Sequence, residues 1–247
     1  MARRRWTRKW IVAALGAAAL LLLVVSVALW RISKADCFVL IGAVTCRVET
    51  DQPMVALTLD DGPTREGTDA ALAALERTGA RATFFVIGHY VDEEPELVRR
   101  IAAAGHEVAN HSYTHRRMIG RSAAFYDEEI ARTAAALRRE GIHGPLFFRP
   151  PFGKKLFGLP RAVERSGHRM IMWDVGEPDL DDPRAYAASI VERARPGSII
   201  LMHVMYDGNA TARAALPLVL DGLRRRGLSV VTVGELLRRS ERRPPRP

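Results

Sequence analysis

The residues of this chain with the clearest chemical potential are two adjacent carboxylates, Asp60 and Asp61, at the end of an apolar run. The segment from Leu57 to Thr64 reads LTLDDGPT. Asp, Gly and Pro are common turn residues, so a plain turn is one interpretation. The other is that one carboxylate binds a cation while its neighbour acts as a base. The polar residues elsewhere in the chain decide between these two interpretations.

Further polar side chains follow other apolar runs. They are His111, His115, Arg149, Asp174, Glu177, Asp179 and His203. A histidine pair four residues apart, or a single histidine at a strand end, is usually structural. On a helical turn, however, the spacing of His111 and His115 would point both imidazoles to one side. The occurrence of all these groups after successive apolar runs favours a common site.

Two histidines and one carboxylate suffice to hold a divalent metal with open positions for water. Water activated by the metal becomes a nucleophile near neutral pH. A second carboxylate beside it can take the proton, and a further histidine can protonate the leaving group. The residue types therefore indicate metal-assisted hydrolysis with a separate base and acid.

The elements that would position these residues alternate between strand and helix. Strand-like runs cover 54–60, 82–88, 106–112, 146–151, 169–175 and 198–204, and a last strand begins at 229. Helical periodicity covers 67–79, 94–105, 122–141, 159–166, 183–194 and 210–226. This alternation predicts an α/β fold with a parallel sheet, open or closed into a barrel. In either form, the chemistry collects at the carboxyl ends of the strands.

Five motifs in order resemble those of the polysaccharide deacetylases, the family with the NodB homology domain (carbohydrate esterase family 4). They are TLDDGP (58–63), HSYTH (111–115), RPPFG (149–153), WDVGEPD (173–179) and LMH (201–203). The resemblance covers residues 46–237 and implies a distorted (β/α) barrel of about seven parallel strands. It also implies a hydrolase that removes N-acetyl groups from an amino-sugar polysaccharide such as peptidoglycan, a chitin-like chain or an exopolysaccharide.

The resemblance assigns the metal ligands and the base. Asp61, His111 and His115 would hold a divalent ion, commonly zinc (Zn²⁺) in the family. Asp60 would be the general base that receives a proton from metal-bound water. Arg149 would pair with Asp60, a contact that spacing alone does not indicate.

The resemblance also assigns the acid and the substrate contacts. His203 would be the general acid, and Asp179 would accept a hydrogen bond from it. The backbone N–H of Phe152 would bind the oxyanion. Leu201 and Pro151 would line the substrate pocket.

Several positions depart from the family pattern: Leu59 replaces a frequent Phe and Val204 a frequent Asp, while Gly176 replaces a usual Asp and Leu180 a usual Trp. These departures leave the shape of the pocket and the sugar specificity open. One alternative is a deacetylase or deformylase of a lipid-linked amino sugar. Another is a non-catalytic glycan-binding protein with a retained metal site.

The net charge of +9 over 247 residues would suit a nucleic-acid partner, but its distribution argues against one. Residues 1–34 and 236–247 carry +7 and +4, so the body between them sums to −2. A basic tail at each end of a near-neutral body does not form a nucleic-acid surface. We expect a glycan substrate, no nucleic acid and a monomer.

The N-terminal segment is typical of a membrane anchor. From Trp10 to Trp30, 21 residues carry no charge, which is enough to cross a bilayer. More basic residues precede this run than follow it, so the N-terminus should be cytoplasmic and the body extracytoplasmic. A cleaved signal peptide is the alternative.

The expected division of the chain follows from these segments. It comprises a basic N-terminus (1–9), a transmembrane anchor (10–30), a linker (31–45), the catalytic domain (46–237) and an Arg/Pro-rich tail (238–247). Cys37 and Cys46 are the only cysteines. An oxidising compartment would permit a bridge between them, and two free buried thiols are an equal alternative.

Overall fold

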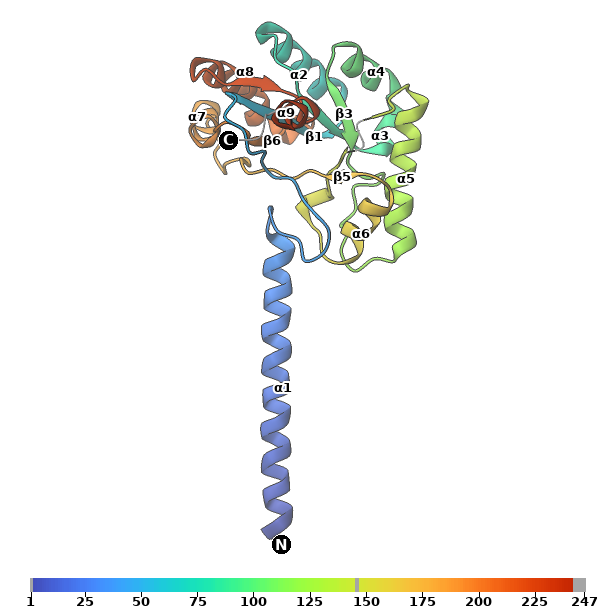
Figure 1. Ribbon diagram of the computed structural model, residues 1–247, viewed down its shortest axis with the longest axis vertical. Helices are drawn as coiled ribbons and strands as arrows, with labels where there is room; N and C mark the ends of the chain where they lie inside the picture. Colours follow the sequence, from blue (N-terminus) through green and yellow to red (C-terminus); the bar gives the residue numbers. More distant parts are fainter. Residues whose placement is uncertain (1, 145–146, 242–247) are drawn as a thin grey trace.

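A computed structural model describes residues 2–144 and 147–241, with the side chains of residues 2–8 left out. A long helix, α1 (Ala2–Lys34), stands out from a single α/β body (Figure 1). Its span Lys9–Lys34 is long and apolar enough to cross a membrane by length and composition. The body leaves the most apolar stretch of this span exposed and contacts α1 only near its end, where Ser33 is buried. Residues 9–28 of α1 are therefore exposed, whereas Leu29, Trp30 and Ser33 near its end line a cavity with residues of the body.

The body is built on a parallel sheet. Its strands are β1 (Met54–Gly62), β2 (Thr83–Val86), β3 (Glu107–Asn110), β4 (Phe147–Phe148), β5 (Arg169–Met170), β6 (Ile199–His203) and β7 (Ser229–Val231). The order is β5-β4-β3-β2-β1-β6, and β7 pairs with β1. Beyond β5, one parallel bridge joins Val175 to Ile200 of β6 and curves the sheet back on itself. The predicted parallel α/β fold is confirmed, in the form of a half-barrel.

Helices cover the outside of this half-barrel (Figure 1). They are α2 (Arg65–Thr78), α3 (Gly88–Glu93), α4 (Pro95–Ala103), α5 (Ala123–Arg139), α6 (Gly158–Arg165), α7 (Pro183–Arg193) and α8 (Ala210–Arg225). The last helix, α9 (Val233–Glu241), packs instead against the inner core that contains Met54 and Ala56. Two of these helices have well-defined caps. Gly79 ends α2 in the left-handed conformation with φ 65°, and the Ser122 side chain accepts from the Phe125 N–H at the start of α5. The first residues of the expected tail, 238–241, belong to α9, and 242–247 lie outside the described residues.

The central strand β1 is buried on both faces and its side chains alternate between two cores. Val55, Leu57 and Leu59 pack outward against α2, α7 and α8. Met54 and Ala56 point into the half-barrel, where they meet apolar residues of β2, β3, β4 and β6. The same alternation sends the side chains of Thr58 and Asp60 to the inner face.

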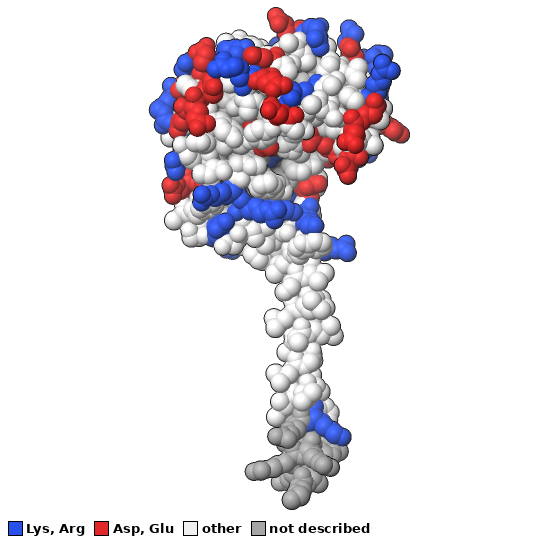
Figure 2. Space-filling view, turned by 180° about the vertical axis from the view of Figure 1, so that it is seen from behind, with Lys and Arg blue, Asp and Glu red and all other residues white. Residues whose placement is uncertain are grey.

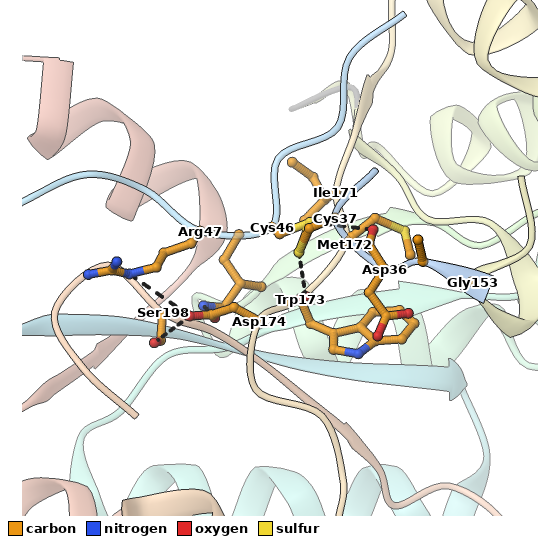
Figure 3. The surroundings of a disulfide bond; sticks show 12 residues. Asp36, Cys37, Cys46, Arg47, Gly153, Ile171, Met172, Trp173, Asp174 and Ser198 are labelled. Carbon is orange, nitrogen blue, oxygen red and sulfur yellow. Dashed lines mark hydrogen bonds and ion pairs between the residues drawn. A yellow bond between two sulfur atoms is a disulfide. The ribbon is translucent and has the colours of Figure 1, made fainter. Parts of the chain in front are cut away.

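The segment after α1 packs on the body. Cys37 and Cys46 form a disulfide with a Cα–Cα distance of 5.6 Å, and Cys37 Sγ lies 3.4 Å from the Trp173 carbonyl oxygen (Figure 3). Thr45 bridges Ile171 in parallel. The question that the sequence left open, bridge or free thiols, is answered by the bridge. The proposed domain boundary at residue 46 stays a prediction.

Candidate active site

Two adjacent carboxylates can serve one site only if the strand that carries them is irregular, because a regular strand points neighbours to opposite faces. The structure supplies that irregularity at Asp61, which has φ 71°. The pairing register of β1 with β2 shifts between Asp60 and Gly62 at the same point. The local bulge turns Asp61 away from the outer core and toward the carboxyl edge of the sheet, beside Asp60.

The two candidate histidine ligands lie on a loop, not on a helical turn. Residues 111–115 follow β3 without helical structure, and Ser112 and His115 have φ values of 65° and 54°. The Ser112 hydroxyl accepts a hydrogen bond from the His115 N–H at 3.1 Å. The prediction of a helical turn at the two histidines was therefore wrong, although both imidazoles do face one side. The left-handed residues reverse the chain and bring His115 back over His111.

A buried carboxylate on α5 holds this loop in shape. Glu129 Oε2 accepts from the backbone N–H groups of Tyr113 and Thr114 at 3.0 and 2.9 Å. Glu129 Oε1 accepts from the Thr114 hydroxyl at 2.7 Å. Sequence reasoning missed Glu129, because a carboxylate on a helix gave no signal that it points inward.

The three candidate ligands converge on one point. The Nε2 atoms of His111 and His115 lie 3.3 and 3.0 Å from Asp61 Oδ1, and one ligand atom from each residue lies within 4.8 Å of the others. His111 Nδ1 lies 2.8 Å from the Arg149 carbonyl oxygen. Since a carbonyl only accepts, Nδ1 carries the proton and Nε2 presents a lone pair to Asp61.

The buried Asp61 Oδ1 makes no hydrogen bond of acceptable geometry within the described chain. A buried carboxylate oxygen facing an imidazole lone pair is unfavourable unless a cation lies between them. Two histidines and a carboxylate are also a donor set that divalent transition metals accept. The residues present therefore fit a divalent metal ion.

Asp60 is buried and its charge is compensated by a fully buried guanidinium. Arg149 Nη1 donates to Asp60 Oδ1 at 2.6 Å and to the Thr58 hydroxyl at 2.7 Å. The remaining donors reach the carbonyl oxygens of Ile171 and Met172 at 3.2 and 3.0 Å. A buried ion pair is tolerated when its other hydrogen-bonding groups are satisfied, as they are here. The second carboxylate oxygen, Asp60 Oδ2, remains directed at the ligand cluster, 3.8 Å from His111 Nε2.

His203 faces the same cluster from β6, because the parallel register sets it beside Asp60. Its Nε2 lies 3.9 Å from Asp61 Oδ2. Its Nδ1 lies 2.6 Å from Glu177 Oε2, and its backbone N–H donates to Glu177 Oε1 at 2.7 Å. Burial lowers the pKa of His203, but the hydrogen bond with Glu177 and the charges of Asp60, Glu177 and Asp61 outweigh it and raise the pKa to about 9.

The expected partner of His203, Asp179, does not reach it. The bridge between Val175 and Ile200 fixes how the segment after β5 runs along β6. Glu177, two residues beyond the bridge, thus reaches the end of β6, whereas Asp179 lies farther out and is exposed. Asp174 has a different role, because it accepts from the Ser198 hydroxyl and the Ile199 N–H (Figure 3).

The loop after β4 forms one wall of the site. Phe152 has φ 57° and a side chain that is 52% exposed, with its ring centroid 4.8 Å from that of His115. Pro151, the preceding residue, and Leu201 of β6 are both buried. Leu180, at the position of the usual Trp, is exposed. The structure thus brings nine of the ten predicted site residues to one end of the sheet. The tenth, Asp179, does not contact His203, and Glu177 makes that contact instead.

Comparison with known proteins gives consistent matches. The family model described as polysaccharide deacetylase matches residues 47–171. A peptidoglycan-N-acetylglucosamine deacetylase of Bacillus cereus is 31% identical over 205 residues, which cover 80% of this chain and 94% of that protein. A chitooligosaccharide deacetylase of Azorhizobium caulinodans is 32% identical over 200 residues, covering 74% and 94%.

Solved structures give the same result. A family 4 carbohydrate esterase from Streptomyces lividans in complex with acetate superimposes with a TM-score of 0.67 at 38% identity, over 72% of this chain and 92% of that one. A CE4 family pseudoenzyme from Bacillus anthracis superimposes with a TM-score of 0.72 at 27% identity, over 80% and 70%. The fold is therefore shared by enzymes and by at least one pseudoenzyme, and the side chains of the site must decide the function.

Proposed function

This chain belongs to the polysaccharide deacetylase family, and on that premise we propose that it removes N-acetyl groups from an amino-sugar polysaccharide. The reaction hydrolyses the amide bond between an acetyl group and a sugar nitrogen. The relatives named above act on peptidoglycan and on chitooligosaccharides, so a chain containing N-acetylglucosamine is the proposed substrate. Peptidoglycan, a chitin-like chain and an exopolysaccharide all contain the required amide.

Asp61, His111 and His115 are the proposed ligands of a divalent metal ion, with zinc as the proposed ion because two imidazoles and a carboxylate suit it. A cation held there would polarise the acetyl carbonyl and lower the pKa of water. The hydrogen bond of His111 Nδ1 to the Arg149 carbonyl oxygen keeps Nε2 available as a ligand. Arg149 thus orients both the ligand His111, through its carbonyl oxygen, and the base Asp60, through its guanidinium.

Asp60 is the proposed general base. Its Oδ1 is occupied by Arg149, so only Oδ2 is free to take a proton from the attacking water. The buried position of the ion pair prevents the carboxylate from rotating away. The base is therefore fixed in orientation before the substrate arrives, which lowers the entropic cost of the proton transfer.

His203 is the proposed general acid. Its Nδ1 is bound to Glu177, so the proton to be donated is on Nε2, the nitrogen that faces Asp61. As the carbon–nitrogen bond breaks, Nε2–H protonates the departing amine, and the acyl carbon leaves as acetate. A raised pKa keeps this imidazole protonated at neutral pH. The N–H of Phe152 is the proposed donor to the oxyanion, and Pro151 and Leu201 the proposed lining of the acetyl pocket.

One observation supports this proposal most strongly. The three candidate ligands, Asp61, His111 and His115, converge between Asp60 and His203, whose orientations are both fixed by hydrogen bonds. The test is acetate release from N-acetylglucosamine oligomers and from peptidoglycan by the full chain. Chelation should abolish release and zinc should restore it, and Asp60→Asn should reduce kcat/KM by about 10²–10⁴-fold. Asp179→Asn is the matched control and should retain activity. Turnover that survives both chelation and Asp60→Asn would refute the mechanism.

The pseudoenzyme among the structural matches defines the competing possibility of a glycan-binding protein without turnover. The complete arrangement of base, acid and ligands argues against it here. Measurable acetate release by the metal-loaded chain would exclude it.

We also propose that α1 anchors the body to the cytoplasmic membrane, with the N-terminus inside and the body outside. The apolar span Lys9–Lys34 and the excess of basic residues before Trp10 support this topology. Proteinase added to intact spheroplasts should then digest the body. A body that is digested only after the spheroplasts are lysed would indicate the opposite topology, with the body in the cytoplasm.

The membrane anchor also favours a second candidate substrate, an amino sugar linked to a lipid. Comparing the turnover of lipid-linked and of soluble acetylated sugars by the reconstituted chain distinguishes a lipid-linked substrate from a polysaccharide. A clear preference for soluble oligomers would exclude the lipid-linked sugar.

A further inference from the structure

A cluster of basic side chains lies where α1 meets the body. Lys34, Arg117, Arg121 and Lys154 line one cavity of about 510 Å³, and we call these four residues the basic collar. The rest of the lining is Leu29, Trp30, Ser33, Ile119 and Leu156, so the cavity combines cations with apolar walls and contains no carboxylate. This combination suits an amphipathic ligand with an anionic group.

The charges of the collar are only partly compensated by nearby carboxylates. In the part of the chain that the structure describes, no carboxylate forms an ion pair with any of the four. Burial lowers the pKa of Lys154, and the charges of Lys34 and Arg117 lower it further, while Asp36 partly opposes them. Asp36 also attracts Lys155, so one exposed carboxylate is shared between two lysines. The collar is therefore a site of net positive potential.

The position of the collar matches the height of lipid headgroups. Lys34 is the last residue of the span that could cross a membrane, and its ammonium lies 3.8 Å from the ring centre of Trp30. Trp and Lys at a helix end are typical of the interface between bilayer and water. Figure 2 shows Lys and Arg side chains in a band across the end of the body from which α1 emerges. A bilayer crossed by α1 would bring its headgroups to this band.

We propose that the basic collar binds the phosphate groups of anionic phospholipids in the leaflet next to the body, and so holds the mouth of the active site at the bilayer surface. The proposal depends on membrane anchoring by α1 and is independent of the deacetylase activity. Lys and Arg close to an anionic membrane surface are attracted to it, and the effect adds up over a cluster.

The collar is connected to the active site by direct contacts. The Arg117 guanidinium lies 5.3 Å from the centre of the Phe152 ring, and that ring packs on His115. Lys154 lies two residues after Phe152 in the same loop. A lipid phosphate held by Arg117 and Lys154 would thus lie beside the loop that forms one wall of the site. Substrate would then have to reach the site at the membrane surface.

The test is hydrogen–deuterium exchange of the full chain reconstituted in vesicles of phosphatidylcholine, with or without phosphatidylglycerol. Phosphatidylglycerol should slow exchange several-fold in residues 116–121 and 153–157 of the wild type. The triple variant Arg117→Gln, Arg121→Gln and Lys154→Gln should lose this protection. Equal exchange of the wild-type loops in the two lipids would overturn the proposal, and that comparison stands even if the variant fails to fold.

A second triple variant removes the same charge elsewhere. Arg77, Arg224 and Arg225 are exposed in the last turns of α2 and α8. Figure 1 shows these two helices on the part of the body away from α1. Replacement of the three arginines by Gln should leave the lipid-dependent protection intact. Equal loss of protection in both variants would mean that total charge, not the collar, attracts the lipid, and would contradict the proposal. Because exchange is read without substrate, an inactive enzyme would not affect the result.

Discussion

At the scale of single residues, the protonation of His203 gives the most direct test of the proposed mechanism. Burial alone would lower its pKa, whereas Glu177 and the charges of Asp60, Glu177 and Asp61 raise it to about 9. A general acid acts only while protonated, so activity should fall as the pH rises through this pKa. Glu177→Gln removes one charge and weakens the hydrogen bond. We expect the alkaline limb of kcat/KM to move to lower pH by about one to two units.

Asp179→Asn is the matched control for this change, because Asp179 lies nearby and is exposed. Its pH–rate profile should coincide with that of the wild type. If Asp179→Asn moved the alkaline limb and Glu177→Gln did not, the assignment of Glu177 would be wrong. A merely structural role of Glu177 would lower activity at every pH without moving the limb.

Residue types and order along the chain were enough to predict the chemistry of the site but not every contact. Asp60, Asp61, His111, His115 and His203 do converge. The choice among the carboxylates of the segment 174–182 was wrong, because it depends on how that segment runs along β6. One bridge between distant residues decides this, and such a bridge has no local signature in the sequence.

At the scale of elements, the loop 111–115 depends on a residue that contacts no proposed ligand side chain. Glu129 of α5 accepts three hydrogen bonds from Tyr113 and Thr114 and so supports the turn that carries His115. Glu129→Gln loses a charge and at least one acceptor position. Since residues that orient metal ligands typically contribute about 10–100-fold to affinity, we expect zinc to bind more weakly by that factor.

Competition with a chromophoric chelator measures this affinity directly, without an activity assay. Glu128→Gln is the control, because Glu128 is exposed and forms an ion pair with Arg132 on the same helix face. Unchanged zinc affinity in a folded Glu129→Gln variant would show that the loop keeps its shape without these bonds.

The turn between α4 and β3 should make stability depend on pH. Burial, and to a smaller extent the charge of Arg81, lower the pKa of His106 to about 4, and His106 Nδ1 accepts from the Ala82 N–H at 3.4 Å. Between about pH 4 and the ordinary value of 6.5, the unfolded chain binds more protons than the folded one. The free energy of unfolding should therefore be highest above pH 6.5 and fall as the pH decreases toward 4.

Urea unfolding of the full chain in detergent at pH 7 and pH 5 measures this loss. His106→Gln, which cannot be protonated, should reduce the difference between the two pH values. An equal difference in the variant would assign the acid sensitivity to other groups.

Element types were predicted well, whereas several boundaries and one helix were not. The apolar run 82–88 was expected to be one strand, but it ends at Val86 and α3 begins at Gly88. The sequence stays apolar across the transition from β2 to α3 because both elements are buried there, so it does not indicate where the strand ends. The loop conformation of 111–115 could not be predicted either, since positive φ at Ser112 and His115 is imposed by Glu129 and by the end of β3.

At the scale of the whole molecule, the segment between α1 and the body is part of the folded structure. The sequence indicated only a linker at 31–45, because its contacts are with residues more than a hundred positions away. Lys155, buried in the body, donates to the Ala35 carbonyl oxygen at 2.7 Å, and Thr45 bridges Ile171. The orientation of the body relative to α1 is therefore fixed by specific contacts, which the proposed lipid collar requires.

The Cys37–Cys46 disulfide should stabilise this junction and, through it, the support of the active site. It closes a short loop in which Cys37 contacts the carbonyl of Trp173. Thr45, next to Cys46, bridges Ile171, whose carbonyl oxygen accepts a hydrogen bond from Arg149. In the chain-entropy description, opening such a loop costs about 2–3 kcal/mol of unfolding free energy. We expect the double variant Cys37→Ser and Cys46→Ser to lose that amount in urea unfolding. Wild type treated with reductant should lose the same amount, and the variant should not respond to reductant. A variant as stable as the oxidised wild type would show that the junction folds without the bridge, and the fixed orientation of the body would then have to come from Lys155 and Thr45 alone.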